Sequence, residues 1–241
     1  MKFRAIAKVV VFDGIAYQTN RFARGVYLGD PINVCNILSD QGCQELNLLF
    51  VGTAPSLNFV SDVLSVCRSP VSVGGVGEHL ADFVQIVASG AEKIILSDSL
   101  WDGSDKPRQL CERFGRQAVA ASVDYIEQGG HRIVVTGKSR NQPVGPLERL
   151  LDQIPQELFG EIVLTNVSRD GQATGLDYGV LDTVRHQVSE LPLLLCGGFC
   201  GEPDVIASGA DGLVSGTHFS LFGKHRAALV NYPEQFGVFH A

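Results

Sequence analysis

The chain has 241 residues, of which 45% are apolar and 19% charged, as is usual for a globular protein. Its net charge of −7 argues against nucleic-acid binding, and no apolar run reaches the roughly 18 residues of a membrane span. The first residues lack signal-peptide organisation, so we expect a cytoplasmic protein with no nucleic-acid or membrane partner. The six cysteines show no metal-binding spacing with histidine, so we expect buried reduced thiols, no metal and no cofactor.

Short runs rich in valine, isoleucine and leucine alternate along the chain with segments of helical period. Such apolar strands are typical of parallel sheets covered on both faces. Eight strands in this length predict an α/β fold, a single (β/α)8 TIM barrel over residues 1–241, with a doubly wound sheet as the alternative. The predicted strands are 5–12, 46–51, 71–73, 93–96, 118–123, 161–166, 191–196 and 212–215.

Two long segments, 13–30 and 125–141, interrupt this alternation and are predicted to be irregular loops. Within the second, residues 132–135 have the composition of a strand and are predicted to form half of an inserted hairpin. Loops of this length on a compact barrel usually serve function.

The sequence also repeats itself about half a chain apart. Val73-Gly74-Gly75 and Cys196-Gly197-Gly198 both follow apolar runs, and each is trailed by a helix-length segment. Those segments end in Ser89-Gly90-Ala91 and Ser208-Gly209-Ala210. The period far exceeds the roughly 20–50 residues of a solenoid repeat, so we expect a barrel built from two similar half-barrels.

Glycines at strand ends predict anion-binding sites at the barrel mouth, where the C-terminal ends of the strands lie. Gly197-Gly198 end the seventh strand and Gly216-Thr217 follow the eighth, so backbone N–H groups there can approach a phosphate closely. Gly74-Gly75 form the symmetry-related phosphate site. We expect this second site to be weaker because Asp98 places a negative charge beside it.

Acid–base residues of such a barrel must also lie at the mouth. Asp124 ends the fifth strand and Asp170 lies in the loop after the sixth. Asp13 follows the first strand, although Phe12-Asp13-Gly14 equally resembles a turn. These three aspartates are the predicted catalytic residues.

Charged residues mark the opposite, N-terminal face of the predicted barrel. They begin, or immediately precede, the first, second, fourth and sixth strands, and so converge around the barrel axis. Either each is separately solvated, or they form a closed ring of salt bridges that gates the base. The four residues are Arg4, Glu45, Lys93 and Glu161.

Together these residues resemble the cyclase subunit family of imidazole glycerol phosphate synthase, a two-fold-repeated (β/α)8 barrel. The resemblance covers almost the whole chain and implies a glutaminase partner on the N-terminal face. It also implies that ammonia passes through the barrel and that Arg4, Glu45, Lys93 and Glu161 form the ammonia gate. The supporting stretches are Asp13-Gly14, Gly29-Asp30-Pro31, 114–119, Val123-Asp124, 161–165 and Arg169-Asp170-Gly171.

The chain departs from that family at the catalytic pair. Asp124 matches the fifth-strand aspartate, but the first-strand aspartate falls on Val10, which cannot transfer protons. Losing one member of an acid–base pair typically costs a factor of about 100 to 10,000, which argues against cyclase activity. Three further family positions differ: the loop lysine is Gln18, the second-strand aspartate is Phe50, and a phosphate-loop glycine is Val76.

A cyclase-like branch associated with glycosyl amidation fits better, because residues 221–233 and 29–33 resemble that branch. It implies work with a glutaminase and an ATP-dependent amidotransferase that convert an acetamido to an acetamidino group on a bacterial surface-glycan sugar. The substrate would be phosphorylated or a nucleotide sugar. Two alternatives stay open: a histidine-pathway cyclase in which Asp13 or Asp170 supplies the missing acid, and a barrel that only scaffolds the glutaminase.

Overall fold

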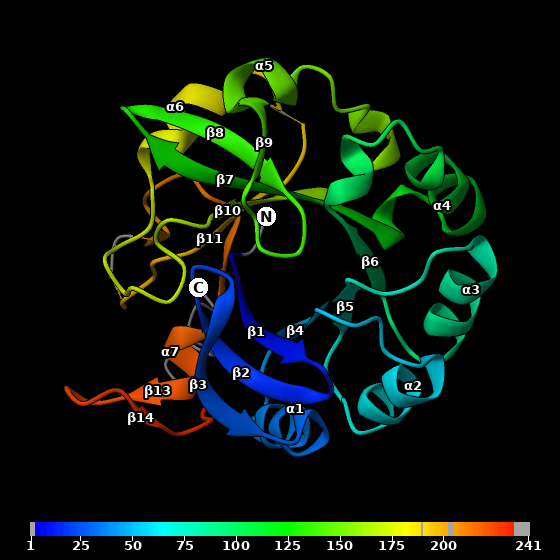
Figure 1. The fold of residues 1–241 in the computed structure, drawn as a ribbon, viewed down its shortest axis with the longest axis vertical. Coiled ribbons are helices and arrows are strands. Elements are labelled where there is room, and N and C mark those ends of the chain that lie inside the picture. The colour runs from blue at the N-terminus through cyan, green and yellow to red at the C-terminus, as the bar shows by residue number, and fades with distance from the viewer. Residues whose placement is uncertain (1–2, 189, 202–204, 234–241) are drawn as a thin grey trace.

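A closed parallel barrel lies at the centre of the computed structural model, which describes residues 3–188, 190–201 and 205–233 (Figure 1). Pairing of the fifth strand with the sixth and of the last with the first closes the wall. The predicted (β/α)8 fold is confirmed. In order around the wall, the strands are β1 (Arg4–Phe12), β4 (Glu45–Val51), β5 (Val71–Gly74), β6 (Lys93–Leu96), β7 (Val119–Gln128), β10 (Glu161–Asn166), β11 (Leu193–Cys196) and β12 (Gly212–Ser215).

Helices cover the outside of the barrel (Figure 1). Local sequence sets where they begin: Asp30 caps the first helix by accepting the N–H of Ile32, and Ser56 caps the second through the N–H of Phe59. None of the described helices combines the length and apolarity needed to cross a bilayer. The helices are α1 (Pro31–Asp40), α2 (Leu57–Ser65), α3 (Leu80–Ala88), α4 (Lys106–Phe114), α5 (Leu147–Leu151), α6 (Gly179–Val184) and α7 (Thr217–Ser220), with 3-10 turns at Asp98–Leu100, Arg116–Ala118 and Gln156–Leu158.

Strand alternation separates the main core from the barrel interior. In β4, Leu46 and Leu48 are fully buried in the main core beneath the helices. The intervening residues Glu45, Asn47 and Leu49 point the other way, into the barrel, because successive side chains of a strand face opposite sides.

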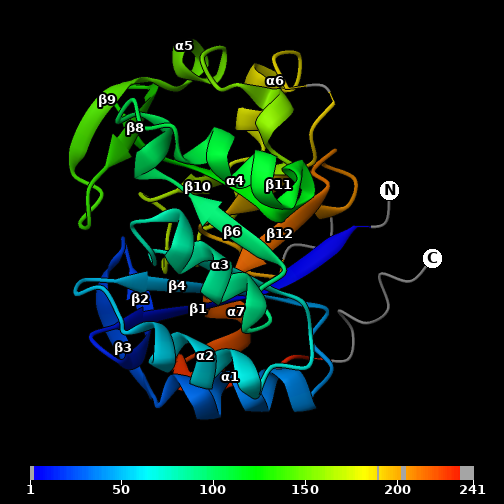
Figure 2. The same cartoon turned by 90° about the vertical axis from the view of Figure 1, so that its right-hand side faces the viewer.

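Two β-hairpins rise from the barrel mouth, one after the first barrel strand and one after the fifth (Figure 2). The pair β2 (Ile15–Asn20) and β3 (Ala23–Gly29) replaces the irregular loop expected over 13–30, so that expectation was wrong. Its turn lacks glycine: Arg21 and Phe22 adopt left-handed φ angles of 51° and 59°, so the usual hairpin signal is missing.

The second hairpin confirms the strand predicted around 132–135, but the expectation of an irregular loop over 125–141 was wrong, because β7 continues to Gln128. It extends β7 through β8 (His131–Thr136) to β9 (Gln142–Pro146). A short pair, β13 (Leu221–Phe222) and β14 (Ala227–Ala228), follows α7.

The sequence repeat corresponds to a repeated packing contact. Gly75, after the third barrel strand, has φ +74°, and a Cβ there would lie 1.8 Å from the carbonyl oxygen of Phe50. Gly197, after the seventh, has φ +94°, and a Cβ there would lie 2.2 Å from the carbonyl oxygen of Asn166. In both halves, glycine lets the loop cross the end of the preceding strand.

Candidate functional site

A connected set of ion pairs lies across the base of the barrel. Arg4 donates from Nε and Nη2 to the two carboxylate oxygens of Glu45, each at 2.5 Å, and from Nη1 to Glu161 Oε2 at 2.6 Å. Lys93 Nζ lies 2.7 Å from that same Glu161 oxygen. The structure therefore brings the four predicted gate residues into one network. It is an open chain from Glu45 through Arg4 and Glu161 to Lys93, and the closed ring is not formed, because among the described residues no ion pair joins Lys93 to Glu45.

The charges of this network stabilise one another. Burial opposes the charge of Arg4, but hydrogen bonds to Glu45 and Glu161 outweigh it and raise the pKa of the guanidinium. Burial likewise opposes ionisation of Glu161, but the hydrogen bond from Arg4 and the charges of Arg4 and Lys93 lower its pKa. Both groups therefore stay charged near neutral pH.

A second ion pair lies deeper in the barrel, between Lys8 of β1 and Asp170. Lys8 Nζ is 2.7 Å from Asp170 Oδ1 and 3.5 Å from Cys196 Sγ. Burial opposes both charges, but each partner stabilises the other, so the pKa of Lys8 is raised and that of Asp170 lowered. Asp170 also accepts hydrogen bonds from Thr19 Oγ1 at 2.6 Å and from the Phe22 N–H at 3.1 Å.

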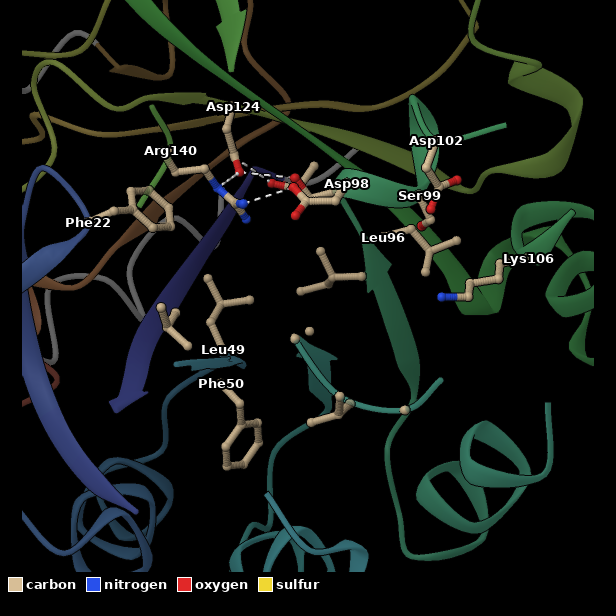
Figure 3. Close-up of a pocket in the computed structure, with 18 of the residues that line it drawn as sticks. Phe22, Leu49, Phe50, Leu96, Asp98, Ser99, Asp102, Lys106, Asp124 and Arg140 are labelled. Carbon is tan, nitrogen blue, oxygen red and sulfur yellow. Dashed lines mark hydrogen bonds and ion pairs between the residues drawn. The ribbon is translucent and has the colours of Figure 1, made fainter. Parts of the chain in front are cut away.

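Asp124 is bound by a cation as well (Figure 3). Its side chain is 1% exposed, and Arg140 Nε lies 2.5 Å from Oδ2. Ser97 and Ser122 donate hydrogen bonds to it at 3.1 and 3.0 Å. Arg140 comes from the tip of the β8–β9 hairpin and also contacts Asp98 at 2.9 Å.

Phe22 connects these two ion pairs. It is 5% exposed, and its ring centroid is 5.3 Å from Lys8 Nζ and 5.3 Å from the Arg140 guanidinium carbon. An aromatic face attracts cations electrostatically at such distances. The tip of the first hairpin is therefore inserted between the two cations of the mouth.

Asp13 lies apart from the other two predicted catalytic aspartates. Its side chain is 45% exposed, pairs with Arg24 and accepts the Thr53 N–H at 3.1 Å. That backbone hydrogen bond and Arg24 lower the pKa of Asp13. In contrast, Asp124 and Asp170 both lie near Cys196. Burial raises the pKa of the Cys196 thiol, and the negative charges of these two aspartates raise it further.

A cavity of about 230 Å³ opens at the first-half mouth and includes Gly74 and Gly75 in its lining. Its inner wall includes the barrel residues Leu49, Ile95 and Ser122. The charged residues around it are Asp98, Asp102, Asp124, Lys106 and Arg140 (Figure 3). Three carboxylates therefore face two cations, a balance that disfavours a phosphate dianion.

At the predicted second-half phosphate site, a side chain of the first hairpin covers Gly216 and Thr217. Gln18 Nε2 donates to Thr217 Oγ1 and to the Thr19 carbonyl, both at 3.0 Å, and Gln18 Oε1 accepts from Ser220 at 3.0 Å. A Cβ on Gly216 would lie 2.6 Å from Gln18 Oε1. The amide therefore lies where a ligand would have to contact Gly216 and Thr217.

The adjacent pair Gly197-Gly198 is also closely packed. Gly198 has φ +102°, and a Cβ there would lie 2.3 Å from the Gly175 carbonyl oxygen. The Gly198 carbonyl itself accepts the Gly175 N–H at 2.9 Å. These contacts explain why glycine is required here independently of any ligand.

The described cysteines form no disulfide and differ in exposure. Cys35, Cys43 and Cys196 are buried as expected, but Cys200 is exposed. Across the parts of the chain that the structure describes, no cluster of three histidine, cysteine, aspartate or glutamate side chains could hold a metal ion.

Sequence reasoning missed the two cations of the mouth. Lys8 carried a usable signal, because it shares the inward parity of Arg4 within an apolar strand. Arg140 carried none, since only the β7–β8–β9 hairpin brings it to Asp124.

The fold and site define the class of protein: a (β/α)8 barrel with an ion-pair network at its base and buried carboxylates near the C-terminal ends of its strands. The model of a family described as "Histidine biosynthesis protein" matches residues 7–225. The chain belongs to this family, in its HisF-like cyclase group.

Relatives of this group match along most of the chain. "Putative imidazole glycerol phosphate synthase subunit hisF2" of Pseudomonas aeruginosa is 28% identical over 242 residues, 96% of each chain. The similarly named hisF3 of Vibrio vulnificus is 29% identical, over 97% of this chain and 94% of its own. "Imidazole glycerol phosphate synthase subunit HisF" of Corynebacterium diphtheriae is 30% identical over 81% of each chain. The resemblance is confirmed for the family, and none of these three names refers to glycosyl amidation.

Proposed function

We propose that the chain is the ammonia-conducting barrel subunit of a glutamine-dependent amidotransferase, serving a reaction other than histidine-pathway cyclisation. One contrast carries this proposal. At the base, Arg4, Glu45, Lys93 and Glu161 form a connected network. At the mouth, the buried carboxylates of Asp170 and Asp124 are each paired with a cation. A glutaminase subunit docks on the N-terminal face and supplies ammonia there.

The geometry of the base suits a gate that opens at Lys93. Among the described residues, Arg4 makes three hydrogen bonds to two carboxylates, whereas Lys93 makes one, to Glu161. Swinging the lysine aside therefore breaks fewer interactions than moving the arginine. Neutral ammonia passes such an opening more readily than ammonium, because desolvating an ion is far more costly.

The mouth does not suit cyclisation. General acid–base catalysis needs a group that can exchange a proton with the substrate. Asp170 has a lowered pKa and is committed to Lys8, Thr19 and Phe22, and Val10 stands at the inward position of β1. The mouth therefore supports delivery of ammonia to an acceptor activated elsewhere.

Glycosyl amidation is the acceptor chemistry that the C-terminal and early sequence stretches favour. An ATP-dependent amidotransferase activates the oxygen of an acetamido group on a phosphorylated or nucleotide sugar. Ammonia attacks the activated carbon, the oxygen leaves together with the phosphoryl or adenylyl group that it received from ATP, and loss of a proton leaves an acetamidino group. In this scheme the barrel supplies ammonia and catalyses no step of the activation.

The test uses the purified chain, the bisphosphate substrate of the cyclase and a high concentration of ammonium salt, which bypasses the glutaminase. The Corynebacterium HisF relative serves as the positive control. We expect turnover at least about 100-fold below that control, as loss of one acid–base partner implies. Turnover comparable to the control would overturn the proposal and establish a histidine-pathway cyclase.

Conduction is tested separately in the complex with the glutaminase. Lys93→Met keeps the length of the side chain but removes the contact with Glu161. We expect Lys93→Met to change the rate at which ammonia from glutamine reaches the acceptor. The rate with added ammonium salt should be unchanged. If partner binding persists and glutamine-dependent transfer is also unchanged, the barrel is a scaffold and the conduit is rejected.

A further inference from the structure

Asn47 carries a buried acceptor with no hydrogen bond. The residue is 5% exposed, and its Oδ1 has no hydrogen-bond partner among residues 3–188, 190–201 and 205–233. Buried polar atoms are nearly always paired, and an unpaired one destabilises the folded state. An oxygen in this state is suited to a small ligand that carries N–H or O–H donors.

The position of Asn47 places this acceptor directly above the base network. It follows Glu45 by two residues on the inward face of β4, a rise of about 7 Å along the strand. In the parallel ladder Asn47 pairs in register with Ser72, and Ser72 pairs with Lys93. Asn47 and Ser72 therefore lie on the wall that runs upward from Lys93.

The interior of the barrel has two unlike walls. On one side, Asn47 of β4, Ser72 of β5 and Ser122 of β7 bring polar groups to a wall that also includes Leu49 and Ile95, and Ser122 donates to Asp124 at the first-half cavity. The opposite side is an apolar cluster beneath the Lys8–Asp170 pair. Polar groups thus mark one route from base to mouth. The apolar cluster consists of Ile6, Val163, Leu194, Cys196 and Val214.

We propose that Asn47 Oδ1 is the acceptor of a buried ammonia-binding site, half-way between the base network and the first-half cavity. This inference rests on the proposed conduction of ammonia. Ammonia donates an N–H to Asn47 and exchanges hydrogen bonds with Ser72. The first-half cavity, where Leu49 and Ser122 meet Asp124, is its exit.

The surroundings select neutral ammonia over ammonium. Lys8 pairs in register with Asn47 and is positively charged, and it is committed to Asp170. Below the site, the carboxylates of Glu45 and Glu161 are committed to Arg4 and Lys93. Among the residues that the structure describes, an ammonium ion would meet a neighbouring cation and carboxylates already paired with cations, whereas a neutral donor meets an open acceptor.

The test observes the site in the full-length chain by NMR, with ammonium chloride as the probe. The side-chain amide of Asn47 is followed at alkaline pH, where neutral ammonia is abundant. The controls are sodium chloride at the same pH and ionic strength, and ammonium chloride near neutral pH. We expect the Asn47 side-chain signal to shift saturably with ammonium chloride at alkaline pH, and not in either control. An equal shift in sodium chloride would be an effect of ionic strength, and no shift with ammonia would mean that water alone occupies the site; either result overturns the proposal.

A variant pair fixes the location. Asn47→Leu removes the acceptor at similar volume, and because it also removes an unpaired buried oxygen we expect it to fold. Ile6→Leu is the matched control on the apolar wall. The ammonia-induced shift of the Ser72 backbone amide should disappear in Asn47→Leu and persist in Ile6→Leu. Its persistence in both variants would overturn the proposal.

This experiment can fail independently of the proposed function. It needs no partner and no acceptor substrate, whereas conduction is read from Lys93→Met in the glutaminase complex. If Lys93→Met uncouples transfer but Asn47 never responds to ammonia, only the inferred site is rejected. If Asn47 responds but Lys93→Met has no effect, the site stands and the conduit is rejected.

Discussion

Lys8 and Asp170 form an ion pair inside the barrel, with Nζ 2.7 Å from Oδ1 and each side chain 3% exposed. Lys8 lies on the first strand, and Asp170 belongs to the loop after the sixth. The same carboxylate holds the first hairpin through Thr19 and the Phe22 N–H. The pair thus joins the barrel wall to the hairpin that closes part of the mouth.

Removing one member of this pair should be strongly destabilising. Lys8→Met leaves the buried carboxylate of Asp170 without its cation, which typically costs about 3–5 kcal/mol. We expect the free energy of unfolding, measured with urea, to fall by that amount. A decrease below about 1 kcal/mol would show that the pair is exposed to water in solution.

The double variant Lys8→Met/Asp170→Asn is the control for charge. It removes both charges and keeps hydrogen-bonding capacity near Thr19 and Phe22. We expect it to recover part of the lost stability relative to Lys8→Met alone, because no uncompensated buried charge remains. Equal losses in the single and double variants would contradict this account.

The stability of the protein should decrease in acid partly through Asp170. Its folded-state pKa lies below the unfolded value of about 3.9, because Lys8 and three hydrogen bonds favour the carboxylate. A group with a lowered folded pKa stabilises the protein above its unfolded pKa. That contribution is lost as the pH falls from about 4 through the folded pKa.

Urea unfolding across this acidic window measures the effect. In Asp170→Asn, which cannot titrate at this position, we expect a shallower decrease in unfolding free energy between about pH 5 and the acid limit. Asp13→Asn is a comparison at an exposed aspartate that also has a lowered pKa. Equal slopes for Asp170→Asn and the unmodified chain would contradict the lowered pKa.

Gln18 should limit anion binding at the second-half site. Its amide contacts Thr217 and lies against Gly216, in the space that a phosphate would need. We expect Gln18→Ala to increase the affinity for inorganic phosphate, measured by calorimetry, and Gln18→Lys to increase it further by about fivefold through added positive charge. Unchanged phosphate affinity in both variants would show that the site is closed by other contacts.

The two half-barrels should respond alike to a methyl group at their equivalent glycines. In Gly75→Ala and Gly197→Ala the new Cβ would meet a carbonyl oxygen at 1.8 and 2.2 Å, at positive φ. We expect each to destabilise by more than about 2 kcal/mol in thermal unfolding. Gly14→Ala, with φ +86° and no atom within 4 Å, is the control and should cost about 1 kcal/mol.

The barrel and its strands could be predicted from the sequence, because buried parallel strands must be apolar and must alternate with helices. It also placed Arg4, Glu45, Lys93 and Glu161 at the same end, since strand starts converge in a closed barrel. The first hairpin escaped prediction because its turn uses Arg21 and Phe22 in left-handed conformations in place of glycine. The sequence could not show whether Asp13 faces the barrel mouth or the solvent, because a side chain in a turn after a strand can point in either direction.

What the sequence determined by itself is the family, the barrel and the spacing of its half-barrels, because these follow from local periodicity and from motifs contiguous in the chain. Only the tertiary structure decided the state of the mouth. Lys8 reaches Asp170 and Arg140 reaches Asp124 through contacts between segments that lie far apart in sequence. The energy of such a contact depends on distance and burial, and neither exists until the chain has closed into a barrel.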